Sequence, residues 1–215
     1  MNLIFDIDGT LWNTTERVAI AWQKAADDMN IPCKPITGDI LKKEFGKTMD
    51  VIAADLFPEV TDTKKLDELV TLCSSYESDI LDALTEEDLK QIIYPGVVDT
   101  LYKLSAKHSL YIVSNCQIGY IELFMRKSGT EPVIKDHLCF GETLTDKGSS
   151  IMTLMERNGI TAEDTLYIGD TRGDEESSRK AGIRFIHCGY GFGEAEDPAY
   201  RISSPEELFS LTNLI

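Results

Sequence analysis

Short apolar runs separated by longer amphipathic stretches follow one another along most of the chain. The first run is Leu3–Phe5, and it is followed directly by acidic residues. Uninterrupted runs of this length are typical of parallel strands that are covered on both faces. Such runs predict strands at about 3–5, 110–113, 138–140, 165–168 and 183–187.

Amphipathic stretches lie between the later strands and predict helices on the faces of the sheet. They fall at about 97–106, 118–127, 149–158 and 175–181. Ser204–Glu207 is expected to begin a terminal helix with Pro205 at its first position. Alternating strands and helices predict an α/β fold with a Rossmann-like, doubly wound parallel sheet as its core.

Roughly a hundred residues separate the first two predicted strands, whereas a strand–helix–strand unit takes about 30. The intervening pattern is mostly helical. Asn13 and Glu16 are expected to form an N-cap and its box partner, and Pro32 lies beyond that helix. Further helices are expected at about 40–43, 49–56, 66–84 and from 85 onward. We therefore predict an α-helical cap at 13–94, inserted into an α/β core made of 1–12 and 95–215.

The charge balance narrows the class of partner. Among 215 residues, 21 are basic and 37 are acidic, which gives a net charge of −16. Because an acidic surface repels nucleic acid and anionic lipid, we expect neither as a partner. A hydrophobic content of 42% is enough for a core, so disorder is not expected.

The cysteine pattern and the N-terminus both favour a cytoplasmic protein. The five cysteines are scattered and form no Cys-x-x-Cys pair, so we expect reduced thiols. The first strand follows Met1 directly, without a signal peptide, and no apolar run reaches the ~18 residues of a membrane span. The expected oligomeric state is a monomer or a homodimer.

Candidate chemistry begins at the end of the first strand. Asp6 and Asp8 are two residues apart, so an extended backbone points both carboxylates to the same side. Gly9 allows a sharp turn that brings backbone N–H groups close to the same place. Carboxylate oxygens suit Mg²⁺, and a carboxylate can attack phosphorus.

Polar residues also follow the other predicted strands. Because ligands of such sheets bind beyond the carboxyl ends of the strands, these residues are expected at one edge. They are Ser114 and Asn115 after the second strand, Asp146 and Lys147 after the third, and Asp170 and Asp174 after the fourth.

The segment Asp6–Leu11 resembles the first motif of the haloacid dehalogenase superfamily of hydrolases, Asp-x-Asp-Gly-Thr-Leu. Ser114, Lys147 and the Gly-Asp-x-x-x-Asp segment that ends at Asp174 are similar to its later motifs, in the same order. The insertion after the first motif resembles the C1 cap of members related to phosphoglycolate phosphatase and β-phosphoglucomutase. Asn13 departs from the Asp common at this position.

The resemblance implies a Mg²⁺-dependent phosphatase acting on a small phosphorylated metabolite, phosphoglycolate-like or a sugar phosphate. Asp6 would be the nucleophile and Asp8 the general acid and base. Lys147 would neutralise negative charge. The metal would be held by Asp6, the Asp8 backbone carbonyl, Asp170 and Asp174, and substrate by Gly9, Thr10, Ser114, Asn115, Lys147 and Lys47.

Lys47 lies in a Phe-Gly-Lys-Thr segment similar to a cap loop that selects substrates in those members, where it could bind a carboxylate or a second phosphate. A solvated surface lysine is the alternative. A phosphomutase of the β-phosphoglucomutase kind would use the same residues, and a non-catalytic phosphate-binding protein is the alternative of another class. The glycine-rich loop Cys188–Gly193 receives no chemical role.

Overall fold

A six-stranded sheet in which all strands run parallel forms the centre of the computed structural model, which describes residues 1–211. The strand order is β3-β2-β1-β4-β5-β6. The chain therefore starts in the middle, moves outward to one edge and then returns to build the other half. Such a doubly wound order confirms the predicted fold class. The strands are β1 (Asn2–Phe5), β2 (Ser109–Ser114), β3 (Ile134–Cys139), β4 (Thr165–Gly169), β5 (Arg184–Cys188) and β6 (Tyr200–Ile202).

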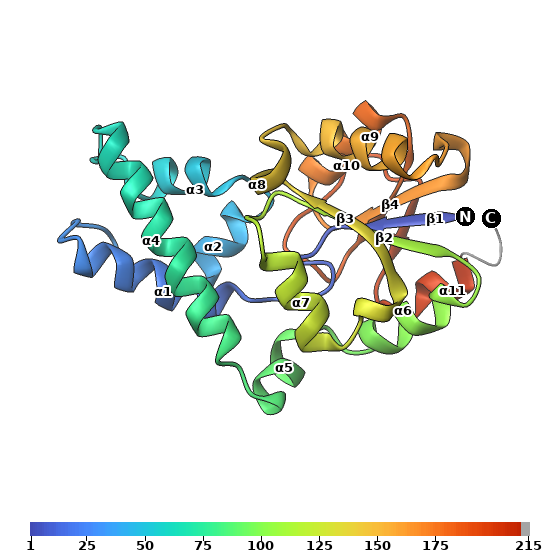
Figure 1. Ribbon diagram of the computed structural model, residues 1–215, viewed down its shortest axis with the longest axis horizontal. Helices are drawn as coiled ribbons and strands as arrows, with labels where there is room; N and C mark the ends of the chain where they lie inside the picture. Colours follow the sequence, from blue (N-terminus) through green and yellow to red (C-terminus); the bar gives the residue numbers. More distant parts are fainter. Residues whose placement is uncertain (212–215) are drawn as a thin grey trace.

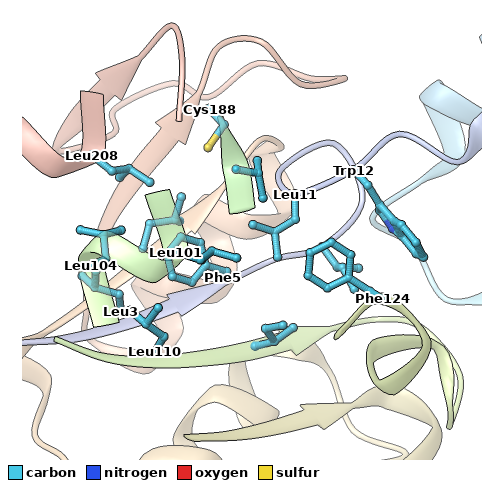
Figure 2. Close-up of a cluster of buried hydrophobic side chains, with 14 of the residues drawn as sticks. Leu3, Phe5, Leu11, Trp12, Leu101, Leu104, Leu110, Phe124, Cys188 and Leu208 are labelled. Carbon is cyan, nitrogen blue, oxygen red and sulfur yellow. The ribbon is translucent and has the colours of Figure 1, made fainter. Parts of the chain in front are cut away.

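Side-chain alternation along the strands divides the core into two layers. Leu3 and Phe5 point into the cluster formed with α6 (Val97–Ser105), α7 (Tyr120–Ser128) and α11 (Glu207–Leu211). Figure 2 shows this layer, in which Leu101, Leu104, Phe124 and Leu208 surround the β1 side chains. Ile4 belongs to the opposite layer, beneath α9 (Lys147–Asn158) and α10 (Arg172–Ala181). Helices therefore cover both faces of the sheet (Figure 1).

The helices of the long insertion lie together to one side of the sheet (Figure 1). They are α1 (Thr15–Asp28), α2 (Gly38–Glu44), α3 (Met49–Leu56), α4 (Thr63–Asp82) and α5 (Glu86–Ile92). Helices α1 to α4 share a hydrophobic cluster of their own, built around Trp22, Phe57 and Leu69. Ile92 of α5 instead joins the sheet-side cluster. A cap over 13–94 stays a prediction, and its separate core supports it.

Several predicted helix boundaries were wrong, and local capping explains the shifts. Helix α1 begins after Thr14 rather than Asn13, whose Oδ1 accepts from the Thr15 N–H instead. Gly119, with φ of 91°, delays α7 until Tyr120. Asp146 caps α9 through the Ser149 N–H, so that helix begins two residues earlier than expected.

The strand predicted at 138–140 is also different. It runs from Ile134 to Cys139, and Phe140 begins the short helix α8 (Phe140–Thr143). Polar residues in its first half hid this strand, which lies at the edge of the sheet and, within residues 1–211, pairs with β2 alone. Likewise, Pro205 lies in the turn before α11 rather than inside it, and the strand β6 was not predicted.

The five cysteines are all free thiols, as the sequence predicts. Among residues 1–211, no helix combines the length and the apolar character needed to cross a bilayer.

Candidate active site

Two carboxyl groups and one hydroxyl group lie close together because the strands that precede them are neighbours in the sheet. Strand β1 pairs in parallel with β2 and with β4, in registers that align Phe5 with Ile112 and with Ile168. The residues that leave the carboxyl ends of these strands therefore lie side by side. Asp6, Ser114 and Asp170 are all buried there, at most 5% exposed.

Lys147 connects the carboxylates of two of these segments. Its ammonium donates to Asp6 Oδ1 at 2.9 Å and to Asp174 Oδ1 at 2.6 Å, and all three side chains are at most 3% exposed. Asp146, as the N-cap of α9, places Lys147 at the first position of that helix. Burial opposes the charge on Lys147, but the two carboxylates hold its pKa well above the usual range.

Asp6, Asp170 and Asp174 form the one group of metal-ligating side chains found among the described residues, and each offers an oxygen within 4.8 Å of the others. Asp174 is fixed by the start of α10, because its Oδ2 accepts from the Thr171 backbone N–H and hydroxyl. Asp170 Oδ2 accepts from the Phe192 N–H at 2.6 Å. Three carboxylates with one lysine leave an excess of negative charge, and a hard divalent cation fits such an oxygen set.

The pKa values of Asp6 and Asp170 reflect the same excess of negative charge. Burial raises the pKa of Asp6 to about 6, although Lys147 opposes this, and Asp174 adds a further repulsive contribution. Burial and the charges of Asp174 and Asp6 raise the pKa of Asp170 well above its usual value. The protein therefore stabilises these carboxylates only in part, and a bound cation would supply the rest.

The absence of a side chain at two glycines makes room for the Asp170 side chain. Gly9 has φ of 81°, and a Cβ at this position or at Gly191 would collide with the Asp170 side chain. The loop Cys188–Gly193, which received no role from the sequence, thus holds Asp170 in place. His187 Nε2 lies 3.0 Å from the Asp170 carbonyl oxygen, so this histidine also helps to position the backbone of Asp170.

Asp8 faces a different set of partners. Tyr120 donates to its Oδ1 at 2.7 Å, and Thr14 donates to the same atom at 3.1 Å. Within the described residues no group donates to Asp8 Oδ2. Burial raises the pKa of Asp8 to about 7, although the Tyr120 hydrogen bond lowers it in part. Asp8 can therefore hold a proton near neutral pH.

Sequence reasoning missed Thr14 and Tyr120. Thr14 is the N-cap residue of α1, and its hydroxyl contacts Asp8 and lies 2.8 Å from the Tyr120 oxygen. Tyr120 comes from the start of α7, whose position depends on how the helix packs. Nothing in the local sequence marks either residue as a partner of Asp8.

Asn115 joins the strand edge to the helical insertion. Its Nδ2 donates to the Gly46 carbonyl at 2.6 Å, which fixes the orientation of the amide. Its Oδ1 is then buried, without a hydrogen-bond partner among the described residues. Phe45 of the helical insertion and Phe192 of the core also pack edge to face, with ring centroids 6.0 Å apart.

A cavity opens between the strand edge and the helical insertion, with Asp6, Asp8, Ser114 and Asn115 in its wall. Lys47 also lines it, as expected of a residue near a substrate, but its ammonium is already paired with Glu44 at 2.6 Å and Asp55 at 2.8 Å. Its role in substrate binding stays a prediction. Cys116 lines the cavity too, and burial raises the pKa of its thiol well above the usual value.

Glu77 of α4 is an acidic lining residue that sequence reasoning missed. The Trp22 indole N–H donates to its Oε1, and burial raises its pKa to about 8. A signal was present, because Leu69, Cys73 and Glu77 are spaced by four residues and so share one face of the helix. An acidic residue that continues an apolar stripe is a candidate for a buried polar role.

The model of the family described as "Haloacid dehalogenase-like hydrolase" matches residues 3–188. A phosphoglycolate phosphatase of Pseudomonas putida is 22% identical over 206 residues, which cover 92% of this chain and 74% of the relative. A phosphoglycolate phosphatase of Vibrio cholerae is 26% identical over 199 residues, covering 90% and 86%.

Solved structures share the fold at low sequence identity. A crystal structure described as a "predicted phosphoglycolate phosphatase" of Haemophilus somnus has a TM-score of 0.84 at 20% identity, and the match covers 98% of this chain and 97% of the other. A haloacid dehalogenase-like family protein of Streptococcus pneumoniae has a TM-score of 0.76 at 19% identity, covering 98% and 97%.

Proposed function

Because the chain belongs to the haloacid dehalogenase-like hydrolase family, we propose that it is a Mg²⁺-dependent phosphatase that hydrolyses a small phosphomonoester through an aspartyl phosphate. The observation that carries this proposal is the buried Lys147 ammonium, bonded to Asp6 and Asp174 beside the carboxylate of Asp170. The attacking carboxylate and the phosphate are both negatively charged and repel each other. The Lys147 ammonium, together with a metal ion held by the carboxylates, is suited to offset that repulsion. The names of the curated relatives also support a phosphomonoester.

The first half of the reaction would use both acids of β1. An Asp6 oxygen attacks phosphorus, the bond from phosphorus to the ester oxygen breaks, and Asp8 gives its proton to the leaving alcohol. The placement of Asp8 suits this role, because Tyr120 and Thr14 hold Oδ1 while Oδ2 accepts no hydrogen bond from the described residues.

The second half returns the enzyme to its starting state. Asp8, now ionised, takes a proton from water, whose oxygen attacks the phosphorus of the aspartyl phosphate. Inorganic phosphate leaves and the Asp6 carboxylate is restored. Ser114 and the backbone N–H groups near it would hold the phosphate oxygens, and Lys147 would remain between Asp6 and Asp174.

Asp6, Asp170 and Asp174 would hold Mg²⁺, which would offset the negative charge of the phosphate when bound. The oxygen donors and their excess charge fit this ion. The Asp8 backbone carbonyl stays a further ligand expected from the family resemblance.

The test is phosphate release from a panel of phosphomonoesters, including sugar phosphates and p-nitrophenyl phosphate, in Mg²⁺ and in EDTA. We expect release in Mg²⁺ and its loss in EDTA. Mg²⁺ at about 100 times its Kd should also stabilise the fold by about 2.7 kcal/mol, read as a rise in Tm. The proposal would be refuted if Mg²⁺ left the Tm unchanged and no ester were cleaved. Conversion of one sugar phosphate into another without release would favour the phosphomutase.

Tyr120→Phe is expected to lower kcat for alkyl phosphates about tenfold, because general acid catalysis depends on the position of its proton. The loss should be much smaller for p-nitrophenyl phosphate, since nitrophenolate leaves without needing a proton. The measurement is kcat for both esters. Tyr102→Phe is the matched control, since the Tyr102 hydroxyl bonds the Gly129 carbonyl at the surface. Equal losses on both esters would show that Tyr120 does not position Asp8 for proton transfer.

A further inference from the structure

The cavity lined by Asp6 and Asp8 would hold the leaving group of the substrate in the reaction proposed above. Its far wall comes from Trp22, from Met49 and Ile52 of α3, and from Ser74 and Glu77 of α4. It encloses about 120 Å³. One water molecule needs roughly 10–15 Å³ of such space, so the cavity has room for a small organic group.

The charges around this cavity do not suit an anionic leaving group. Among the lining residues that the structure describes, Lys47 is the only cation, whereas Asp6, Asp8 and Glu77 are acids. Glu44 and Asp55 bind the Lys47 ammonium, so this surface group of three carries a net charge of −1 when all are ionised. A carboxylate on the leaving group would therefore find no uncompensated positive charge beyond the phosphate site.

Glu77 provides an acceptor in the far wall. Trp22 donates to its Oε1 and thereby fixes the carboxyl group, while no described residue donates to Oε2. Burial makes ionised Glu77 costly, as its raised pKa shows. A hydrogen-bond donor on the ligand, and above all a cationic donor, would offset this cost.

We propose that this cavity selects a small alcohol group that carries no negative charge and donates a hydrogen bond to Glu77, as a polyol or an amino alcohol does. This substrate class rests on the phosphatase function proposed above. It differs from the glycolate group in the names of the curated relatives, because a glycolate carboxylate would face Glu77. A carboxylate there would also find no free counter-ion, because Glu44 and Asp55 already bind the Lys47 ammonium.

The test uses three phosphate esters of nearly equal size. Phosphoglycolate carries a carboxylate, hydroxyethyl phosphate a neutral hydroxyl, and aminoethyl phosphate an ammonium. We expect kcat/KM for the hydroxyethyl or the aminoethyl ester to exceed that for phosphoglycolate by at least about tenfold, which corresponds to about 1.4 kcal/mol. The better of these two esters distinguishes a polyol from an amino alcohol.

Glu77→Gln keeps the shape of the side chain and removes its ability to ionise when a cationic group binds. We expect it to lower the ratio of kcat/KM for aminoethyl phosphate to that for phosphoglycolate by about tenfold. Glu68→Gln is the matched control, because Glu68 lies exposed on the same helix and outside the cavity wall. Its ratio should equal that of the wild type, and Tm values verify that both variants fold.

Four results would overturn the proposal. Phosphoglycolate could be the best ester, with its advantage lost in Lys47→Ala, which would mean that Lys47 binds a carboxylate. Glu77→Gln could lower kcat/KM for all three esters by one factor, which would make Glu77 merely structural. Cleavage of p-nitrophenyl phosphate without preference among the three esters would refute the selectivity alone, whereas failure of every ester would refute the phosphatase function as well.

Discussion

Asp6→Asn is expected to lower kcat for phosphate release by about 10⁴-fold or more, comparable to the loss of a nucleophile in other covalent catalysts. A carboxamide is a poor nucleophile and cannot form the aspartyl phosphate on which the proposed reaction depends. The fold should survive, because Asn still accepts a hydrogen bond from Lys147 and one of three mutually repelling carboxylates is removed. The measurement is released phosphate in Mg²⁺, together with Tm.

Asp99→Asn makes the same chemical change on the exposed side of α6 and should retain the wild-type rate. A Tm of Asp6→Asn at or above that of the wild type would show that the lost rate does not come from unfolding. Substantial activity in Asp6→Asn would contradict the proposal directly, because phosphorus would then be attacked by another group, such as water.

The residues at the centre of this site could be placed from the sequence because the carboxyl ends of parallel strands share one edge of the sheet. Any residue directly after a parallel strand lies at the same edge, so Asp6, Ser114 and Asp170 could be placed together without knowing the packing. Lys147 does not follow from this rule alone, because the helix α8 lies between β3 and the N-cap Asp146, and its contact with Asp6 depends on where α9 begins. Their roles in the reaction stay proposals.

The second layer of contacts could not be predicted in this way. Tyr120 reaches Asp8 across 112 positions of sequence, and Phe192 reaches Asp170 across 22. Each contact depends on where a helix or a loop comes to rest after packing. The glycines of the Cys188–Gly193 loop could be recognised as a flexible pattern, but Asp170 as the group for which Gly191 makes room could not.

The overall fold was predictable except where polar residues interrupted a strand or a cap shifted a helix. Strand β3 carries Lys135, Asp136 and His137, so its first half did not look buried. Strand β6 has three residues, too few to form a recognisable period. These misses lie at one end of the sheet or the other and do not affect the central strands that build the site.

Lys147→Met is expected to have the second largest effect, this time on stability as well as on rate. Breaking a buried ion pair by removing one partner costs about 3–5 kcal/mol, because the remaining charges are left uncompensated. Here Asp6 and Asp174 would both lose their shared cation at a position that is at most 3% exposed. We expect the free energy of unfolding, measured with urea in EDTA, to fall by about that amount.

Mg²⁺ should separate the two roles of Lys147. If Asp6, Asp170 and Asp174 hold the ion, it will neutralise the carboxylates that Lys147→Met leaves unpaired, so Mg²⁺ should stabilise the variant more than the wild type. The rate should still fall about 10²–10³-fold, as for loss of one preorganised donor. Lys90→Met, which breaks an exposed pair with Glu87, should change stability by at most about 1 kcal/mol. Equal stabilisation of both proteins by Mg²⁺ would mean that the ion and the ammonium do not act on the same carboxylates, and the electrostatic basis of the proposed site would fail.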